Sequence, residues 1–258
     1  MGILVLDVGT TGARAVLFDE AGSLQGMSYR EYHSRFGPAG VVDHNPETWR
    51  SAVFELVPKV LQQTGVSPNW VTAVAVTTQR ATVFPVNREG DPLAWAMSWQ
   101  DKRTLPECQE LTDGLGEGEL YRVTGLRIDP YFSLPKLMWF QRHQPELYHA
   151  AFRFVTVHDW VLQQLTGRFV TDWTQASRTQ LFDITRREWV PELARAAGLP
   201  DVPLPEVRPP GSLVGGLTKN AALRLGLLEG TPVVAAGGDQ QAAAVGLGVI
   251  QPGWVQGV

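Results

Sequence analysis

The feature that most constrains the fold is a short apolar segment, residues 232–236, which runs into two glycines and the carboxylate of Asp239. An apolar run of this length is typical of a buried strand, and residues 240–246 are rich in good helix formers. A strand that leads directly into a helix places Asp239 at the carboxyl end of the strand, where open α/β sheets bind their ligands. Two interpretations stay open for Asp239: a helix N-cap or a functional carboxylate.

A second carboxylate of this kind lies near the start of the chain. Residues 3–6 form a continuous apolar run that ends in Asp7, and a second strand is predicted over residues 13–18. The short turn between them contains Gly9 and Gly12, so the two strands are expected to form a hairpin. The turn is not a Walker-type P-loop, because it has no lysine and no helix follows it.

The hairpin can nevertheless hold phosphate. Gly9 permits close backbone approach, and the hydroxyls of Thr10 and Thr11 are expected to face the same spot as the backbone N–H groups. Arg14 can add charge-assisted hydrogen bonds. A bare carboxylate beside phosphates is repulsive, so Asp7 fits such a site if Mg2+ lies between them, held through water. The alternative is an Asp satisfied within the hairpin itself.

Polar or aromatic residues also follow other predicted elements. Residues 71–76 indicate a buried strand, and Thr77-Thr78-Gln79-Arg80 follows it at the expected ligand edge. Trp99 can lay its ring on the C–H face of a small polyol or sugar, but in a chain with nine tryptophans a Trp half-buried under a loop is the commoner case. A turn at residues 129–133 presents the hydroxyl of Tyr131.

Several boundaries can be predicted from capping and breaking residues. Asn45 should cap a helix that Pro58 kinks or shortens, and Asp159 should cap another. The proline-rich residues 199–211 form either an interdomain linker or, as we prefer, a surface loop within one domain. Residues 253–258 resemble the beginning of a strand.

Composition narrows the class of protein. The 258 residues suffice for one large α/β domain or two small ones, and 44% hydrophobic with 19% charged residues is typical of a soluble globular protein. A net charge of -4 implies no basic surface for nucleic acid, and no apolar stretch is long enough to span a membrane. The single cysteine, Cys108, suits a reducing compartment. Because no basic leader precedes the first strand, we expect a cytoplasmic location.

One strand-end carboxylate for a metal and another for a hydroxyl proton are what phosphoryl transfer to an alcohol requires. At these and other positions the chain resembles the FGGY carbohydrate kinases, in family order and over nearly its whole length. The matching segments are Asp7-Val8-Gly9-Thr10-Thr11 with Arg14, Gln79-Arg80, Trp99-Gln100-Asp101-Lys102-Arg103-Thr104, Asp129-Pro130-Tyr131-Phe132-Ser133, Val170-Thr171-Asp172 with Ala176-Ser177-Arg178, and Gly238-Asp239-Gln240-Gln241. Within the family, the resemblance is strongest to the glycerol kinases.

The resemblance implies an α/β fold, an actin-like (ribonuclease H-like) ATPase lobe with a mixed central sheet and flanking helices, and ATP bound in a cleft between two lobes. It implies ATP-dependent phosphorylation of a hydroxyl on a small polyol or sugar. Asp239 would be the general base, and Asp7 would bind Mg2+ through water. The residues near the phosphates would be Gly9, Thr10, Thr11 and Arg14, and those lining the substrate pocket Arg80, Trp99, Tyr131, Asp239 and Gln240.

Two departures from the family pattern limit what can be expected. In the glycerol kinases a glutamate that accepts a hydrogen bond from the polyol follows the arginine, whereas Ala81 follows Arg80 here. Family members are also roughly twice as long, so residues 1–258 resemble the N-terminal, substrate-binding lobe without the C-terminal nucleotide lobe. An actin-like ATPase switch and a non-catalytic carbohydrate-binding domain remain as alternatives, and homo-oligomerisation is left open.

Overall fold

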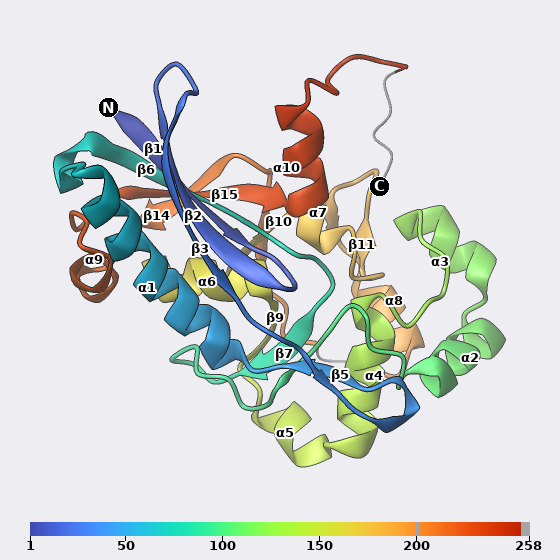
Figure 1. Cartoon of the computed structure of the whole chain (residues 1–258). Coiled ribbons are helices and arrows are strands. Elements are labelled where there is room, and N and C mark those ends of the chain that lie inside the picture. Colours follow the sequence, from blue (N-terminus) through green and yellow to red (C-terminus); the bar gives the residue numbers. More distant parts are fainter. Residues whose placement is uncertain (200–201, 254–258) are drawn as a thin grey trace.

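The computed structural model describes residues 1–199 and 202–253. Its main feature is a mixed six-stranded sheet in the order β14-β15-β6-β1-β2-β3 (Figure 1). The strands are β1 (Gly2–Val8), β2 (Gly12–Asp19), β3 (Leu24–Glu31), β6 (Val71–Thr78), β14 (Ser212–Gly216) and β15 (Pro232–Gly238). The expected start of a strand at residues 253–258 falls almost entirely outside the described residues.

Two kinds of strand connection build this sheet. The chain opens as an antiparallel meander of β1, β2 and β3, joined by short turns, and the first two strands form the predicted hairpin. The strands β1, β6 and β15 are instead parallel neighbours, so long crossovers must join them. Since the carboxyl ends of parallel strands lie at one edge, three strand ends far apart in the sequence meet there.

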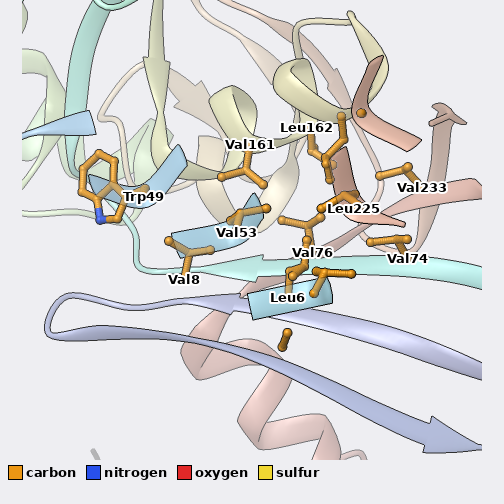
Figure 2. Packing of buried hydrophobic residues seen from close by; sticks show 14 of the residues in the cluster. Leu6, Val8, Trp49, Val53, Val74, Val76, Val161, Leu162, Leu225 and Val233 are labelled. Carbon is orange, nitrogen blue, oxygen red and sulfur yellow. The ribbon is translucent and has the colours of Figure 1, made fainter. Parts of the chain in front are cut away.

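Three helices cover the sheet on the side of its main hydrophobic core. They are α1 (Pro46–Thr64), α6 (Val157–Thr166) and α9 (Lys219–Leu225). The helices α1 and α6 pack against the strands, and α9 packs against α1 and α6. Figure 2 shows the apolar residues between them: Leu6, Val8, Val74, Val76 and Val233 from the strands, and Trp49, Val53, Val161, Leu162 and Leu225 from the helices. Burial on this scale rigidly fixes the sheet from which the site projects.

A second group of elements lies on the opposite side of the molecule from α9 (Figure 1). Its sheet has the order β4-β5-β8-β7-β9, with β4 (Arg35–Phe36), β5 (Val42–His44), β7 (Val83–Val86), β8 (Ala96–Met97) and β9 (Arg153–Thr156). Its helices are α2 (Leu105–Gly114), α3 (Glu117–Thr124), α4 (Ser133–His143), α5 (Pro145–Ala150) and α8 (Pro191–Ala196). A separate apolar cluster, which includes Leu134, Leu137, Phe140 and Phe154, forms its core.

The remaining elements are short. Two small strand pairs join β10 (Val170–Asp172) to β13 (Glu206–Arg208) and β11 (Phe182–Asp183) to β12 (Glu188–Trp189). The helix α7 (Trp173–Ala176) follows β10, and α10 (Asp239–Gly246) follows β15. Two 3-10 turns span Pro38–Gly40 and Pro68–Trp70. In the described part of the chain, no helix combines the length and apolar character needed to cross a membrane.

Local expectations were met in part. Asn45 caps α1 by accepting from the Glu47 N–H, as predicted. The expectation for Pro58 was wrong in so far as α1 is not shortened, because the helix continues through it to Thr64. Asp159 is not an N-cap: it stands at the third position of α6 and accepts from the backbone N–H of Thr156. The proline-rich segment is more than a loop, since it contains β13.

Candidate active site

The sheet brings both strand-end carboxylates to one edge. Asp7 in β1 pairs in register with Thr77 in β6, and Gly238, directly before Asp239, pairs with Thr78 on the other side of β6. Strands two apart are separated by about 10 Å. The backbones that carry Asp7 and Asp239 therefore flank β6 with a gap of about that width, and the charge of Asp7 is felt at Asp239.

Asp239 is the first residue of α10, and the N-cap position belongs to Gly238. The N-cap interpretation of Asp239 is therefore wrong. One carboxylate oxygen accepts from the Gln240 N–H at 2.8 Å and lies 3.6 Å from Nε of Arg80, and the side chain remains 42% exposed. Burial, with a smaller contribution from Asp7, raises the pKa of Asp239, while the Gln240 N–H and Arg80 oppose the rise. The group is a half-buried carboxylate of increased basicity, as a general base needs.

Arg80 is the cation that pairs with the carboxylate of Asp239. Its side chain is only 4% exposed, and its Nη2 donates to Oε1 of Gln240. An added Cβ on Gly238 would overlap the Cδ of Arg80, so only glycine allows the guanidinium to lie against the β15–α10 turn. Arg80, Asp239 and Gln240, all predicted for the substrate pocket, are thus in mutual contact.

The β1–β2 turn has the predicted form of a glycine-containing hairpin loop. The Gly9 N–H donates to the carbonyl of Gly12 at 3.0 Å, and the Gly9 carbonyl accepts from the Tyr32 hydroxyl at 2.8 Å and from Nε2 of Gln79 at 3.1 Å. Thr10 is half-buried and Thr11 is exposed. The loop is therefore tied to β6 through Gln79 while its tip remains accessible.

Arg14 and Asp7 form an ion pair at 2.9 Å, with side chains 47% and 27% exposed. Within residues 1–199 and 202–253, no cluster of three His, Cys, Asp or Glu side chains could hold a metal ion. Asp7 is thus a single carboxylate paired with the Arg14 guanidinium, and it belongs to no such cluster in the described residues. Such a donor set fits Mg2+ only in the way Mg2+ often binds, with several of its waters retained and one carboxylate nearby.

Trp99 connects the β1–β2 hairpin to Tyr131. Its indole N–H donates to the Thr10 hydroxyl at 2.8 Å, and that hydroxyl is 3.2 Å from Oε1 of Gln79. The Trp99 and Tyr131 rings lie 5.5 Å apart between centroids, tilted by 53°. Trp99 is therefore both a structural residue and one side of an aromatic wall, so the two interpretations of the sequence do not exclude each other.

Two further basic residues lie at the site, and neither of them was assigned a role from the sequence. Arg178, which sequence reasoning placed only within a motif, lies 5.2 Å from the ring of Tyr131 and close enough to Arg80 to affect its pKa. Lys136, in α4, is fully buried and donates to the carbonyls of Ala81 at 2.9 Å and Tyr131 at 2.7 Å. Only Arg178 carried a signal in the sequence, namely its place in a matching motif, because a lysine in a helix normally lies at the surface.

Comparison with known proteins is consistent with this geometry. The fold is that of an actin-like ATPase: the structure superposes on xylulose kinase from Rhodospirillum rubrum with a TM-score of 0.92 over 98% of this chain and 52% of that one, at 24% identity. Glycerol kinase from Plasmodium falciparum, solved with ADP, superposes with a TM-score of 0.88 over 97% of this chain and 51% of that one, at 23% identity.

The sequence comparison is more specific. Residues 2–246 match the N-terminal domain of the FGGY family of carbohydrate kinases, and the chain belongs to that family. It is 38% identical to glycerol kinase from Thermococcus gammatolerans, over 98% of this chain and 51% of that protein. It is 39% identical to glycerol kinase from Methylibium petroleiphilum, over 97% of this chain and 51% of that protein. The chain thus spans about half the length of the curated relatives that it matches.

Proposed function

We propose that this chain is the substrate-binding lobe of a kinase that transfers the γ-phosphoryl group of ATP to a hydroxyl of a small polyol or sugar. The observation that carries the proposal is the placement of Asp239, beside Arg80, and Asp7 on either side of β6 at one sheet edge. Family membership and the similarity to glycerol kinases support it. The nucleotide-binding lobe would be a separate segment, as the length of the relatives indicates.

In this proposal each residue has a separate task. Asp239 accepts the proton of the attacking hydroxyl, which its exposed and more basic carboxylate suits. Arg80 and Gln240 hold substrate oxygens, and Trp99 with Tyr131 forms an apolar wall for C–H groups. Gly9, Thr10, Thr11 and Arg14 lie near the phosphates.

Asp7 would hold Mg2+ through water, and the ion would supply charge neutralisation between the phosphates when bound. The Arg14 guanidinium already neutralises Asp7. Positioning and electrostatic stabilisation are the main contributions a protein makes to this reaction.

The substrate is proposed to be larger than glycerol. Ala81 lacks the carboxylate that the glycerol kinase pattern supplies beside Arg80, and it is buried, with 1% exposed. Four- and five-carbon polyols and ketoses are the classes we expect to fit best. The buried free thiol of Cys108 suits the cytoplasmic location proposed for such an enzyme.

The proposed function is tested by ADP release from ATP and Mg2+, measured on the enzyme with both lobes across a panel of glycerol, tetritols, pentitols, ketopentoses and aldonates. Acceptor-dependent ADP formation with a phosphorylated product in the mass spectrum supports it. ATP hydrolysis that no acceptor stimulates would favour the actin-like switch. Binding of a sugar without any phosphorylation would favour the carbohydrate-binding domain.

A further inference from the structure

The turn between β15 and α10 is held from two sides by threonine hydroxyls. On one side, the Thr77 hydroxyl of β6 donates to the carbonyl of Gly237 at 2.9 Å. On the other, the hydroxyl of Thr174 in α7 accepts the Gly238 N–H at 2.7 Å. These two backbone groups belong to the two residues that precede Asp239. The direction in which Asp239 leaves the sheet is therefore fixed by contacts outside its own strand.

The turn could not be held by its own conformation. Gly237 has a φ of +94°, and the ladder between β15 and β6 shifts register just before Gly238. A backbone with positive φ and an interrupted ladder has few intrinsic constraints. An added Cβ on Gly237 would approach the Thr174 hydroxyl to 3.2 Å, which shows how closely α7 is applied to the turn.

Thr174 is itself held by a buried carboxylate. Its hydroxyl donates to Oδ1 of Asp172 at 2.5 Å, and the same oxygen accepts the Thr174 N–H at 2.7 Å. Asp172 is completely buried, and its Oδ2 lies 3.5 Å from Nε2 of the equally buried His158 in α6. Because the Thr174 proton is committed to Asp172, the hydroxyl oxygen is oriented to accept from Gly238. The chain of contacts thus runs from α6 through Asp172 and Thr174 to the residue before Asp239.

We propose that Thr174, oriented by Asp172, is a positioning residue for the reaction, whose hydroxyl sets the direction of the Asp239 carboxylate through the Gly238 N–H. The expected effect on kcat rests on the proposed function, whereas the hydrogen bond from the Gly238 N–H to Thr174 does not depend on it. Thr174 needs no contact with substrate or nucleotide. Its loss should therefore affect the transfer step more than substrate binding.

The test compares Thr174→Val with Thr174→Ser. Valine keeps the shape of threonine and removes the hydroxyl, whereas serine keeps the hydroxyl and removes only a methyl group. Asp172 still caps α7 in both variants through the Thr174 N–H. We expect Thr174→Val to lower kcat about 10- to 100-fold, the scale of a misplaced catalytic group, with KM for the best panel acceptor changed less than about threefold. Thr174→Ser should restore kcat to within about threefold of the unmodified enzyme.

Thr124→Val is the matched control. Like the Thr174 hydroxyl, the Thr124 hydroxyl donates one hydrogen bond and accepts one, in this case to the Leu120 carbonyl and from the Leu126 N–H. Thr124 is buried at the end of α3 and does not belong to the site. This control should leave kcat unchanged. If Thr124→Val lowers kcat as much as Thr174→Val does, general destabilisation explains both and the inference is overturned.

A second measurement separates this inference from the proposed function. Amide hydrogen exchange at Gly238, followed by NMR, should be at least about tenfold faster in Thr174→Val than in Thr174→Ser. If the unmodified enzyme phosphorylates no acceptor, the proposed function fails and the exchange experiment still decides the structural claim. Unchanged exchange at Gly238, or a Thr174→Val enzyme with normal kcat, contradicts the role given to Thr174.

Discussion

At the scale of single residues, the proposed reaction depends most on the carboxylate of Asp239, which is expected to accept the proton of the attacking hydroxyl. Replacing Asp239 by Asn keeps the size and the contact with the Gln240 N–H but removes the proton acceptor. We expect kcat to fall by about 10²–10⁴-fold, the usual contribution of a general base, while substrate affinity changes much less. Steady-state kinetics of the enzyme with both lobes measures this. An Asn variant with near-normal kcat would mean that Asp239 is only structural.

The protonation of Asp239 also predicts the acidic limb of the pH–rate profile. The base acts only when ionised, and burial raises the pKa of Asp239 from its ordinary value. Activity should therefore be lost, as the pH falls, at a higher pH than an ordinary aspartate would give. The same limb should be absent from the residual activity of the Asp239→Asn variant.

Ala81 is the residue expected to decide between glycerol and larger acceptors. Ala81→Glu supplies the missing acceptor beside Arg80, and a hydrogen bond to a charged group contributes about 1.5–3 kcal/mol, or roughly 10- to 150-fold. The preference for glycerol over pentitols, measured as a ratio of kcat/KM, should rise by that factor. Ala81→Gln, of equal size but uncharged, is the control and should shift the ratio less. Glycerol as the best acceptor of the unmodified enzyme would refute the expectation, as would an unshifted Ala81→Glu variant.

Lys136 makes stability depend on pH. Complete burial lowers the pKa of Lys136 to about 7, although Asp101 and Asp129 partly oppose this, whereas an unfolded lysine titrates near 10.4. Between roughly pH 7 and 10.4 the unfolded state binds more protons, so the free energy of unfolding gains up to about 1.4 kcal/mol per pH unit from this group. Below pH 7 lysine is protonated in both states and the gain is absent.

The measurement is urea unfolding of the chain at several pH values, for the unmodified protein, Lys136→Met and Lys59→Met. Since Lys59 is exposed on α1, its removal should leave the pH dependence of stability unchanged. In Lys136→Met, the free energy of unfolding relative to the unmodified protein should fall progressively from pH 7 to pH 10. Parallel pH curves for all three proteins would show that Lys136 does not titrate in this range.

At the scale of elements, the β15–α10 turn joins a strand to a helix at a point where no side chain fits. An added Cβ on Gly238 would overlap Arg80, whereas one on Gly114, at the end of α2, would meet nothing within 4 Å. Gly238→Ala should therefore displace Arg80, weaken acceptor binding and destabilise the protein by about 1–3 kcal/mol, as overpacking usually does. Gly114→Ala should change neither acceptor binding nor stability. Thermal unfolding and acceptor titration check this pair, and equal behaviour of the two variants would contradict it.

At the scale of the whole molecule, the chain spans about half the length of the curated relatives that it matches, and we propose a phosphate-binding role only for its β1–β2 hairpin. Phosphoryl transfer requires the nucleotide to be held against the acceptor by both halves of a cleft. We therefore expect the 258-residue chain alone to show no useful turnover of ATP in a coupled assay, and the addition of a nucleotide-binding lobe to restore it. Turnover by the chain alone at the rate of ordinary kinases would show that its site is complete.

The sequence by itself determined the elements and the strand ends. The apolar runs of β1, β6 and β15 and the glycines beside Asp7 and Asp239 mark buried strands that stop at a polar edge, because hydrophobicity and the backbone freedom of glycine can be read from the residue types alone. The motifs in family order then predicted the fold, which the comparison with solved structures confirms, and the residues that we propose for the pocket. Even so, local pattern could not show that Gly238, and not Asp239, caps α10.

Only the tertiary structure decided which strands are neighbours and what holds the site. Three contacts of the site join residues that are far apart in the sequence. Trp99 contacts Thr10, 89 positions away; Lys136 contacts Ala81, 55 away; and Thr174 contacts Gly238, 64 away. No periodicity or propensity encodes such pairs, because each depends on where the packed core places two backbones. The same packing buries Lys136 completely, although lysine usually lies at the surface, since burial depends on the fold as well as on the residue type.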